Sequence, residues 1–254
     1  MTAPLLPGAE PFSATGGPDS VLVLHGFTGS PASMRGVAEK LADAGLTVEL
    51  PRLPGHGTAV DDLVPTRWAD WTAAAETAYQ ELAARSARVA VVGLSMGGSL
   101  TCWLAERHPE ISGIAVVNPL VEPPGDELRS AIHDMLDAGV SIAPSIGSDI
   151  AMPGVAELGY DGTPLAAALS LFEGVEDVAL ALGDIRCPVL LLSSREDHVV
   201  PPTNGDLLAA SVAGPCERVW LERSYHVATM DYDRDEVEVR TVSFVIGVTA
   251  GAEA

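Results

Sequence analysis

The sequence predicts an α/β fold with a mostly parallel sheet that helices flank on both faces, and with a small helical cap inserted into it. Short apolar runs, of the length of buried strands, alternate along the chain with longer segments of helical period. Hydrophobic residues make up 47% of the 254 residues and charged residues 19%, as in an ordinary globular protein. A chain of this length fits one domain with an insertion better than two independent domains.

The first predicted elements are a strand over 21–24 and the helix that follows it. Ser30 is the expected N-cap of this helix and Pro31 takes its first position, because proline is favoured where no backbone N–H is needed. Gly45 marks the end of the helix. The apolar run 47–50 is the next predicted strand.

The rest of the chain continues this alternation, apart from one long interruption. Apolar side chains at helical spacing predict a helix that contains Trp68, Trp71, Ala75, Ala78 and Leu82. A strand over 88–94 then leads into a helix that ends before Pro109. The remaining predicted elements are, in order, strands over 114–117, 188–192 and 218–221 and a final helix over 234–248.

The interruption is the segment 120–183, which contains five prolines separated by short pieces rich in alanine, leucine, isoleucine and methionine. None of these pieces alternates like a strand. We predict that the segment forms a cap over the carboxyl ends of the strands, where open α/β sheets bind ligands. A peripheral helical decoration is the alternative. The chain then divides into a partly ordered tail (1–20), an α/β core (21–119 and 184–254) and the cap (120–183).

Residues 93–97, with the sequence Gly-Leu-Ser-Met-Gly, lie where the predicted strand 88–94 meets the next helix. A serine on such a sharp turn has a strained backbone, and its hydroxyl projects above the sheet. Glycines flank it because a Cβ at either position would collide with the neighbouring strand or helix. We predict that Ser95 is a nucleophile; a chance match to a five-residue pattern is the alternative.

A serine hydroxyl is a weak nucleophile at neutral pH, so it needs a base, and the base needs an orienting carboxylate. His226 follows the last predicted strand and Asp197 follows the strand before it, so both should reach the same sheet edge as Ser95. The chain order of serine, aspartate and histidine is the one that this type of turn requires. Glu196 is the neighbouring alternative for the carboxylate, and Asp197 is preferred for its short, fixed reach.

The oxyanion of an acyl-transfer intermediate needs hydrogen-bond donors. One predicted donor is the backbone N–H of Met96, directly after the serine. The other is the N–H of Phe27 in the loop after the first strand, where Gly26 allows the backbone to approach closely. His25 is expected to brace this loop, and His56 to take part in a turn near the rim of the pocket.

Four segments together resemble the bacterial α/β-hydrolase carboxylesterases, and especially the small bacterial monoacylglycerol lipases and thermostable carboxylesterases. They are His-Gly-Phe-Thr-Gly-Ser-Pro at 25–31, Leu-Pro-Gly-His-Gly at 53–57, Gly-Leu-Ser-Met-Gly-Gly at 93–98 and Ser-Tyr-His-Val-Ala-Thr at 224–229. The resemblance covers most of the chain from about residue 21 and is weakest in the cap. It implies an α/β-hydrolase fold and hydrolysis of medium- or long-chain acyl esters, including monoacylglycerols. At the matching positions it implies Ser95 as nucleophile, Asp197 as acid, His226 as base, and Phe27 and Met96 as oxyanion donors.

The formal net charge is −21, from 14 basic and 35 acidic side chains. Such a charge repels nucleic acid and anionic membrane surfaces, and it favours small neutral or apolar substrates. No apolar run reaches the length of a membrane span, the first residues lack the basic region of a secretory signal, and three scattered cysteines form no disulfide pattern. Cytoplasmic residence is therefore expected. No metal or other cofactor is expected, and monomer and dimer both stay open.

Several apolar residues are predicted to contact the acyl chain, with packing inside the core or cap as the alternative for each. They are Phe27, Met96, Ile132, Met135, Leu136, Ile146, Leu169 and Phe172. Two further functions stay open at this point. The same residues can perform another reaction, such as C–C or thioester hydrolysis, or the fold can serve a non-catalytic ligand-binding relative.

Overall fold

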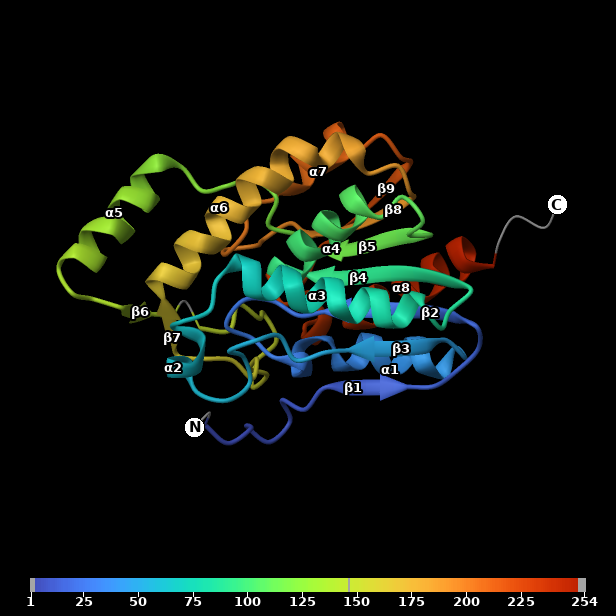
Figure 1. Cartoon of the computed structure of the whole chain (residues 1–254), viewed down its shortest axis with the longest axis horizontal. Helices are drawn as coiled ribbons and strands as arrows, with labels where there is room; N and C mark the ends of the chain where they lie inside the picture. The colour runs from blue at the N-terminus through green and yellow to red at the C-terminus, as the bar shows by residue number, and fades with distance from the viewer. Residues whose placement is uncertain (1–2, 146, 251–254) are drawn as a thin grey trace.

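A seven-stranded sheet forms the centre of the molecule (Figure 1). The structure is a computed structural model that describes residues 3–145 and 147–250. The strand order is β1-β3-β2-β4-β5-β8-β9, and every neighbouring pair is parallel except β1 with β3. The strands are β1 (Phe12–Ala14), β2 (Asp19–Leu24), β3 (Thr47–Leu50), β4 (Arg88–Leu94), β5 (Gly113–Val117), β8 (Val189–Ser194) and β9 (Cys216–Leu221). The predicted mostly parallel sheet is thus confirmed.

Helices cover both faces of this sheet (Figure 1). They are α1 (Arg35–Asp43), α2 (Val60–Leu63), α3 (Trp68–Ala83), α4 (Met96–Arg107), α5 (Asp126–Asp137), α6 (Leu165–Ala181), α7 (Thr203–Ser211) and α8 (Arg234–Thr249). None of the helices in the described ranges is long and apolar enough to cross a membrane.

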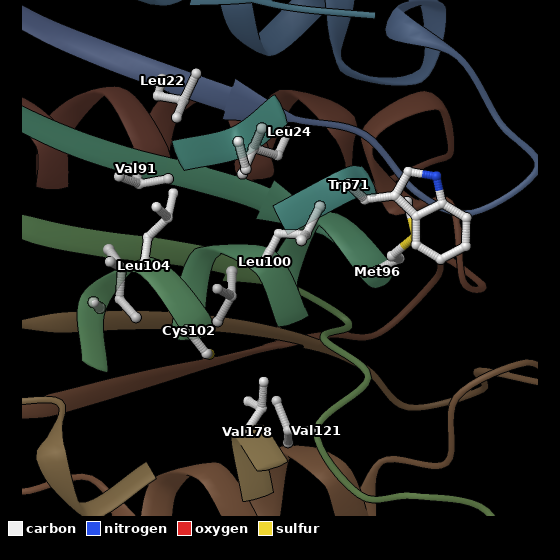
Figure 2. Packing of buried hydrophobic residues seen from close by; sticks show 14 of the residues in the cluster. Leu22, Leu24, Trp71, Val91, Met96, Leu100, Cys102, Leu104, Val121 and Val178 are labelled. Carbon is white, nitrogen blue, oxygen red and sulfur yellow. The ribbon is translucent and has the colours of Figure 1, made fainter. Parts of the chain in front are cut away.

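Two hydrophobic clusters lie on opposite faces of the sheet, because alternate residues of a strand point to opposite sides. Leu22 and Val91 belong to the cluster under α3, α4 and α6, whose close packing Figure 2 shows. Val21 and Val92 belong to the cluster under α1 and α8. Burial of each such side chain contributes about 1.5–3 kcal/mol. These continuous apolar strands are buried on both faces, as expected of a parallel sheet.

The chain before α1 differs from the prediction at Ser30. A 3-10 turn (Pro31–Met34) precedes α1, and Ser30 stands at the N-cap of this turn with Pro31 in the first position. The Ser30 hydroxyl makes no capping bond. It donates instead to the carbonyl oxygen of Leu158, 2.8 Å away in the segment 120–183. Ser30 therefore has the predicted N-cap position, ahead of a 3-10 turn, but its side chain makes no capping hydrogen bond.

The N-terminal segment is more ordered than a loose tail. Phe12–Ala14 forms β1, which pairs antiparallel with β3, and β2 already begins at Asp19. The guanidinium of Arg35 lies 5.0 Å from the centre of the Phe12 ring and holds the strand against α1. A strand of three residues is too short to produce an alternation that can be recognised in a sequence.

The segment 120–183 holds α5, α6 and two short strands between them, β6 (Ile142–Pro144) and β7 (Gly162–Pro164). The strands pair antiparallel, which contradicts the expectation that no piece of this segment is extended. Ile132 and Leu169 join α5 to the first half of α6 in a small hydrophobic cluster. Val175 and Val178, near the end of α6, belong to the main core. Ala167 and Leu171, in the first half of α6, belong to the main core as well, so α6 packs on the core along its length and also contacts α5 in its first half.

Candidate active site

Ser95 occupies the turn between β4 and α4, with φ 56° and ψ −120°. A residue other than glycine rarely adopts such a conformation, and the surroundings must enforce it. Ser95 is partly exposed, whereas residues 91–94 and 96–100 are buried. The turn therefore raises this one side chain out of an otherwise closed core.

The two flanking glycines permit the turn. A Cβ at Gly93 would overlap the carbonyl oxygen of Gly97, and a Cβ at Gly97 would overlap the carbonyl oxygen of Leu24 at the end of β2. Each clash is with backbone, so no side chain can rotate away to relieve it. Glycine is consequently required at both positions for α4 to pack this closely against the sheet.

The structure brings Asp197 and His226 together from the loops after β8 and β9. Oδ2 of Asp197 lies 2.7 Å from Nδ1 of His226, and both side chains are buried. The other carboxylate oxygen, Oδ1, accepts the backbone N–H groups of Val199 (2.9 Å) and Val200 (2.8 Å). These bonds fix the carboxylate in its loop. Glu196, the alternative acid, is exposed.

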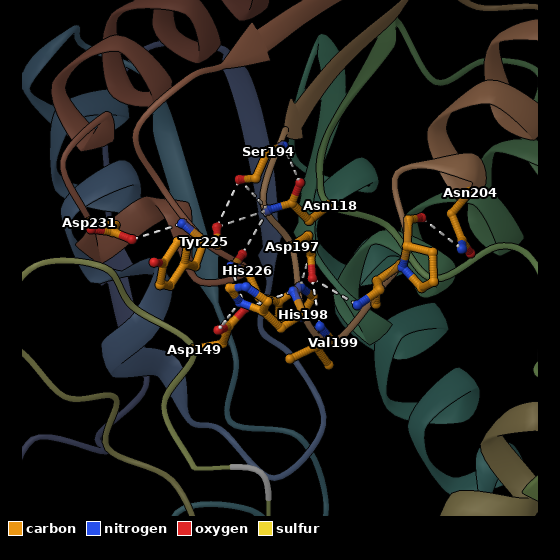
Figure 3. Close-up of polar contacts among 12 residues, drawn as sticks. Asn118, Asp149, Ser194, Asp197, His198, Val199, Asn204, Tyr225, His226 and Asp231 are labelled. Carbon is orange, nitrogen blue, oxygen red and sulfur yellow. Dashed lines mark hydrogen bonds and ion pairs between the residues drawn. The ribbon is translucent and has the colours of Figure 1, made fainter.

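The peptide groups around His226 are held from two sides (Figure 3). The His226 N–H donates to Oδ2 of Asp149 (3.0 Å), and its carbonyl oxygen accepts from Nδ2 of Asn118 (2.8 Å). Asn118 follows β5 with φ 43° and also bonds to Ser194 at the end of β8. The imidazole is thus anchored to the sheet through Asn118 and to the segment 120–183 through Asp149. Sequence reasoning identified neither residue.

The loop after β2 lies against Ser95, as required for a second oxyanion donor. A Cβ at Gly26 would lie 3.4 Å from Cβ of Ser95, in ordinary van der Waals contact, so the backbone of this loop passes directly beside the serine. Phe27 follows in the same loop, and Met96 is the first residue of α4, where backbone N–H groups have no partner within the helix. Both predicted donors are therefore at the serine turn.

His25 braces this loop in a definite tautomer. Its Nε2 accepts the N–H of Leu53 (3.1 Å), so the ring proton is on Nδ1 and donates to the carbonyl oxygen of Gly26 (2.9 Å). Complete burial lowers the pKa of His25 to about 4, so the ring is neutral at pH 7. His56 is also buried, with its ring edge-on to Trp71, and it bonds to its own turn through Pro54.

A cavity of about 800 Å³ opens above Ser95 and His226. One wall comes from the core loops, through Phe27 and Val200, and the other from the segment 120–183, including Phe172. A further hollow of about 860 Å³ lies beside β1, and none of the five predicted site residues lines it. The larger hollow is therefore separate from the arrangement of serine, aspartate and histidine.

The predicted acyl contacts divide into three groups. Phe27 and Phe172 line the cavity. Met96 is buried in the main core, and Ile146 lies outside the described residues. The other four pack between α5 and α6 and so support the cavity wall from behind; they are Ile132, Met135, Leu136 and Leu169.

Glu157 is a polar member of the cavity wall that sequence reasoning missed. Oε1 of this residue accepts a hydrogen bond from the hydroxyl of Ser33, 2.7 Å away. Burial is the largest cause of a raised pKa for this carboxyl, and the Ser33 bond and the charge of His226 oppose it. A single acidic residue in a loop has no spacing that marks it in a sequence. Among the described residues, no group of histidine, cysteine or acidic side chains has the arrangement of a metal site.

Comparison with known proteins agrees with this geometry. The model of the alpha/beta hydrolase family matches residues 21–240. A thermostable monoacylglycerol lipase of Bacillus sp. (strain H-257) is 46% identical over 245 residues, 95% of this chain and 96% of the relative. A carboxylesterase of Bacillus subtilis (strain 168) is 27% identical over 93% of this chain and 96% of its own length.

Solved structures show the same fold. One from a study of the metagenome-derived lipolytic enzymes LipS and LipT has a TM-score of 0.92 and 42% identity, over 96% of this chain and all of that chain. The monoacylglycerol lipase of Paleococcus ferrophilus has a TM-score of 0.78 at 16% identity, over 94% of this chain and 98% of that chain, which supports the fold alone. With the family model covering most of the sequence, this chain belongs to the alpha/beta hydrolase family.

Proposed function

We propose that this protein is a serine hydrolase that cleaves carboxylic esters of medium- or long-chain fatty acids, with monoacylglycerols as the preferred substrates. The observation that carries the proposal is the cavity into which both Ser95 and His226 open. The hydrogen bond between His226 Nδ1 and the buried Asp197 gives this pair the chemistry that an activated serine needs.

The reaction follows from the tautomer of His226. Because Nδ1–H donates to Asp197, Nε2 carries a lone pair and can accept the Ser95 proton as the hydroxyl attacks the ester carbonyl. The N–H groups of Phe27 and Met96 stabilise the oxyanion. His226 then protonates the departing alcohol, which leaves an acyl group on Ser95.

Water completes the cycle. His226 removes a proton from the water as it attacks the acyl carbonyl, and the proton returns to Ser95 when the fatty acid leaves. The serine, the imidazole of His226, the ester and water account for every bond formed or broken in these steps.

Two features support monoacylglycerol as the substrate. The relative from Bacillus sp. that is 46% identical is named a monoacylglycerol lipase. The cavity also combines apolar side chains, among them Leu171 and Phe172, with the carboxyl of Glu157. Apolar walls suit the acyl chain, and a buried carboxyl suits the free hydroxyls of a glycerol group. We propose that the segment 120–183 acts as the cap that supplies the acyl wall.

Fluorophosphonate labelling of Ser95→Ala tests the nucleophile. We expect loss of labelling and a fall of about 10⁴-fold or more in ester hydrolysis, because the members of such a triad act as a unit. Ser141→Ala, at an exposed serine before β6, is the control and keeps both properties. Labelling or turnover that survives in Ser95→Ala would exclude the assignment.

A substrate panel tests the acyl preference. It contains p-nitrophenyl esters from acetate upward, a thioester, and mono-, di- and triacylglycerols. We expect kcat/KM to rise above its value for acetate and monoacylglycerol to be the best acylglycerol. A steady fall from acetate onward would indicate a small pocket, and faster thioester cleavage would point to a different reaction of the same serine.

A further inference from the structure

The segment between β6 and β7 contacts both loops that carry the proposed acid and base. Asp149 in this segment accepts three hydrogen bonds through its carboxylate. Oδ2 accepts the N–H of His226 (3.0 Å) and the N–H of His198 (3.1 Å), and Oδ1 lies 2.8 Å from Nδ1 of His198. His198 directly follows Asp197. One carboxylate therefore spans the loops after β8 and β9.

The surroundings of Asp149 allow it to hold the loops after β8 and β9 together. Its side chain is 11% exposed, whereas the His198 side chain is 56% exposed, so the bond to the N–H of His226 is the best shielded of the three. The backbone oxygen of Asp149 also accepts the N–H of Val227, 3.1 Å away. The carboxylate raises the pKa of His198, which favours the protonated ring and an ion pair between them. Charge-assisted hydrogen bonds of this kind are shorter and stronger than neutral ones.

A second carboxylate joins the same two segments, with the acceptor now in the loop after β9 and the donors in the inserted segment. Asp231, fully buried in the core, accepts the N–H groups of Ala151 (2.7 Å) and Met152 (2.9 Å) from the inserted segment. It also accepts the N–H of Tyr225, next to the proposed base, at 2.9 Å. Residues 149–152 and 225–231 are thus joined by an acceptor from each side. Figure 3 shows the bonds of Asp149 and the bond between Asp231 and Tyr225.

We propose that Asp149 is a positioning residue for His226, so that the inserted segment fixes the geometry of the base in addition to shaping the cavity. Asn118 holds the carbonyl oxygen of His226 and Asp149 holds its N–H, so the two peptide groups on either side of His226 are both held in place. With the backbone fixed, Nδ1 keeps its bond to Asp197 and Nε2 faces the cavity. This inference depends on the proposed roles of Ser95 and His226.

The experiment compares Asp149→Ala and Asp149→Asn with the wild-type protein. The readouts are kcat and KM for a short water-soluble ester, the rate of fluorophosphonate labelling, and the melting temperature. A short ester needs little of the acyl wall, so a role confined to the wall would leave its turnover unchanged. Asp134→Ala, at an exposed carboxylate on α5, is the matched control within the inserted segment.

We expect Asp149→Ala to lower kcat and the labelling rate by about 10²-fold with a smaller change in KM, because a small misplacement of a catalytic group has that effect. Asp149→Asn should recover a large part of the loss, since its amide oxygen can still accept the N–H of His226. The control should match the wild type.

Two results would overturn the proposal. One is an Asp149→Ala protein with wild-type kcat and labelling rate; the other is a change confined to KM. Should Asp149→Ala fail to fold, Asp149→Leu decides by the same readouts, because it fills a similar volume but offers no acceptor for the N–H of His226. Turnover that persists in Ser95→Ala would instead contradict the proposed function itself. Failure of the Asp149 proposal and failure of the proposed function are therefore distinguishable.

Discussion

At the scale of single residues, the serine turn depends on the absence of side chains at the flanking glycines, Gly93 and Gly97. Gly97 lies so close to the end of β2 that a Cβ there would overlap the carbonyl oxygen of Leu24. A conformation as strained as that of Ser95 persists only where the surrounding structure determines it. The reactive geometry is therefore set by backbone packing and not by the serine side chain.

Gly97→Ala should destabilise the protein by about 3 kcal/mol or more, because the added methyl group forces α4 away from the sheet. Urea unfolding measures the change, and ester turnover should fall with it. Gly247→Ala in α8 is the control. The added Cβ has no heavy atom of the described residues within 4 Å, and alanine should stabilise that helix by about 0.5–1 kcal/mol. Equal effects of the two substitutions would contradict the packing argument.

The sequence predicted Ser95, Asp197 and His226 because each follows a strand, and strand ends meet at one edge of a parallel sheet. Asp149 and Glu157 could not be found in this way. They lie in an irregular segment between two short strands, where neither a helical nor a strand period relates one residue to the next. Only the folded chain brings them to the cavity.

At the scale of elements, α5 is held mainly by a small cluster. Ile132 and Leu169 contact across the α5–α6 interface, with Met135 and Leu136 packed around them. This cluster lies behind the cavity wall that Phe172 contributes to. Arg129 on α5 also donates a hydrogen bond to the carbonyl oxygen of Phe172 (3.2 Å) and pairs with Glu176, so the position of the wall depends on this cluster and on Arg129.

Ile132→Ala should loosen α5, because truncation of a buried isoleucine costs about 2–5 kcal/mol of local packing. We expect KM for an octanoate ester to rise more than KM for acetate, and proteolysis within α5 to become faster. Leu180→Ala on α6 is the control, since that side chain is 88% exposed. An unchanged ratio between the two esters would show that α5 does not shape the acyl site.

The core helices α1, α3, α4 and α8 and the apolar strands of the core were predicted with small shifts at their ends. The helix α7 and the bounds of α5 and α6 were not predicted. The strands β1, β6 and β7 have three residues each and were missed, since three residues cannot establish an alternating pattern. Each of these strands is fixed by pairing with a strand that is distant in the sequence, β1 with β3 and β6 with β7.

At the scale of the whole molecule, the charge of −21 acts against folding, because like charges repel more strongly in the compact state. Salt should relieve this repulsion. The screening length falls from about 10 Å at 0.1 M to about 3 Å at 1 M salt. We expect the melting temperature at pH 7 to rise with NaCl, by about 2–4 °C for each kcal/mol gained.

The same series of melting temperatures with increasing NaCl, measured near the isoelectric point, is the control for the salt effect. The isoelectric point is close to 4.4, so at pH 4.4 the net charge is close to zero and the gain from NaCl should be much smaller. An equal gain at both pH values would show that screening of net charge is not its cause. This prediction needs composition alone and no knowledge of the fold.

The paired carboxylates Asp149 and Asp231 matter for protein engineering. Chimeras that exchange insertions between relatives treat the inserted segment as an independent module. Here such an exchange would cut hydrogen bonds that run in both directions across the boundary, from 149–152 to 225–231. A productive recombinant must therefore inherit both segments from one parent, which makes residues 225–231 part of the unit to be transferred.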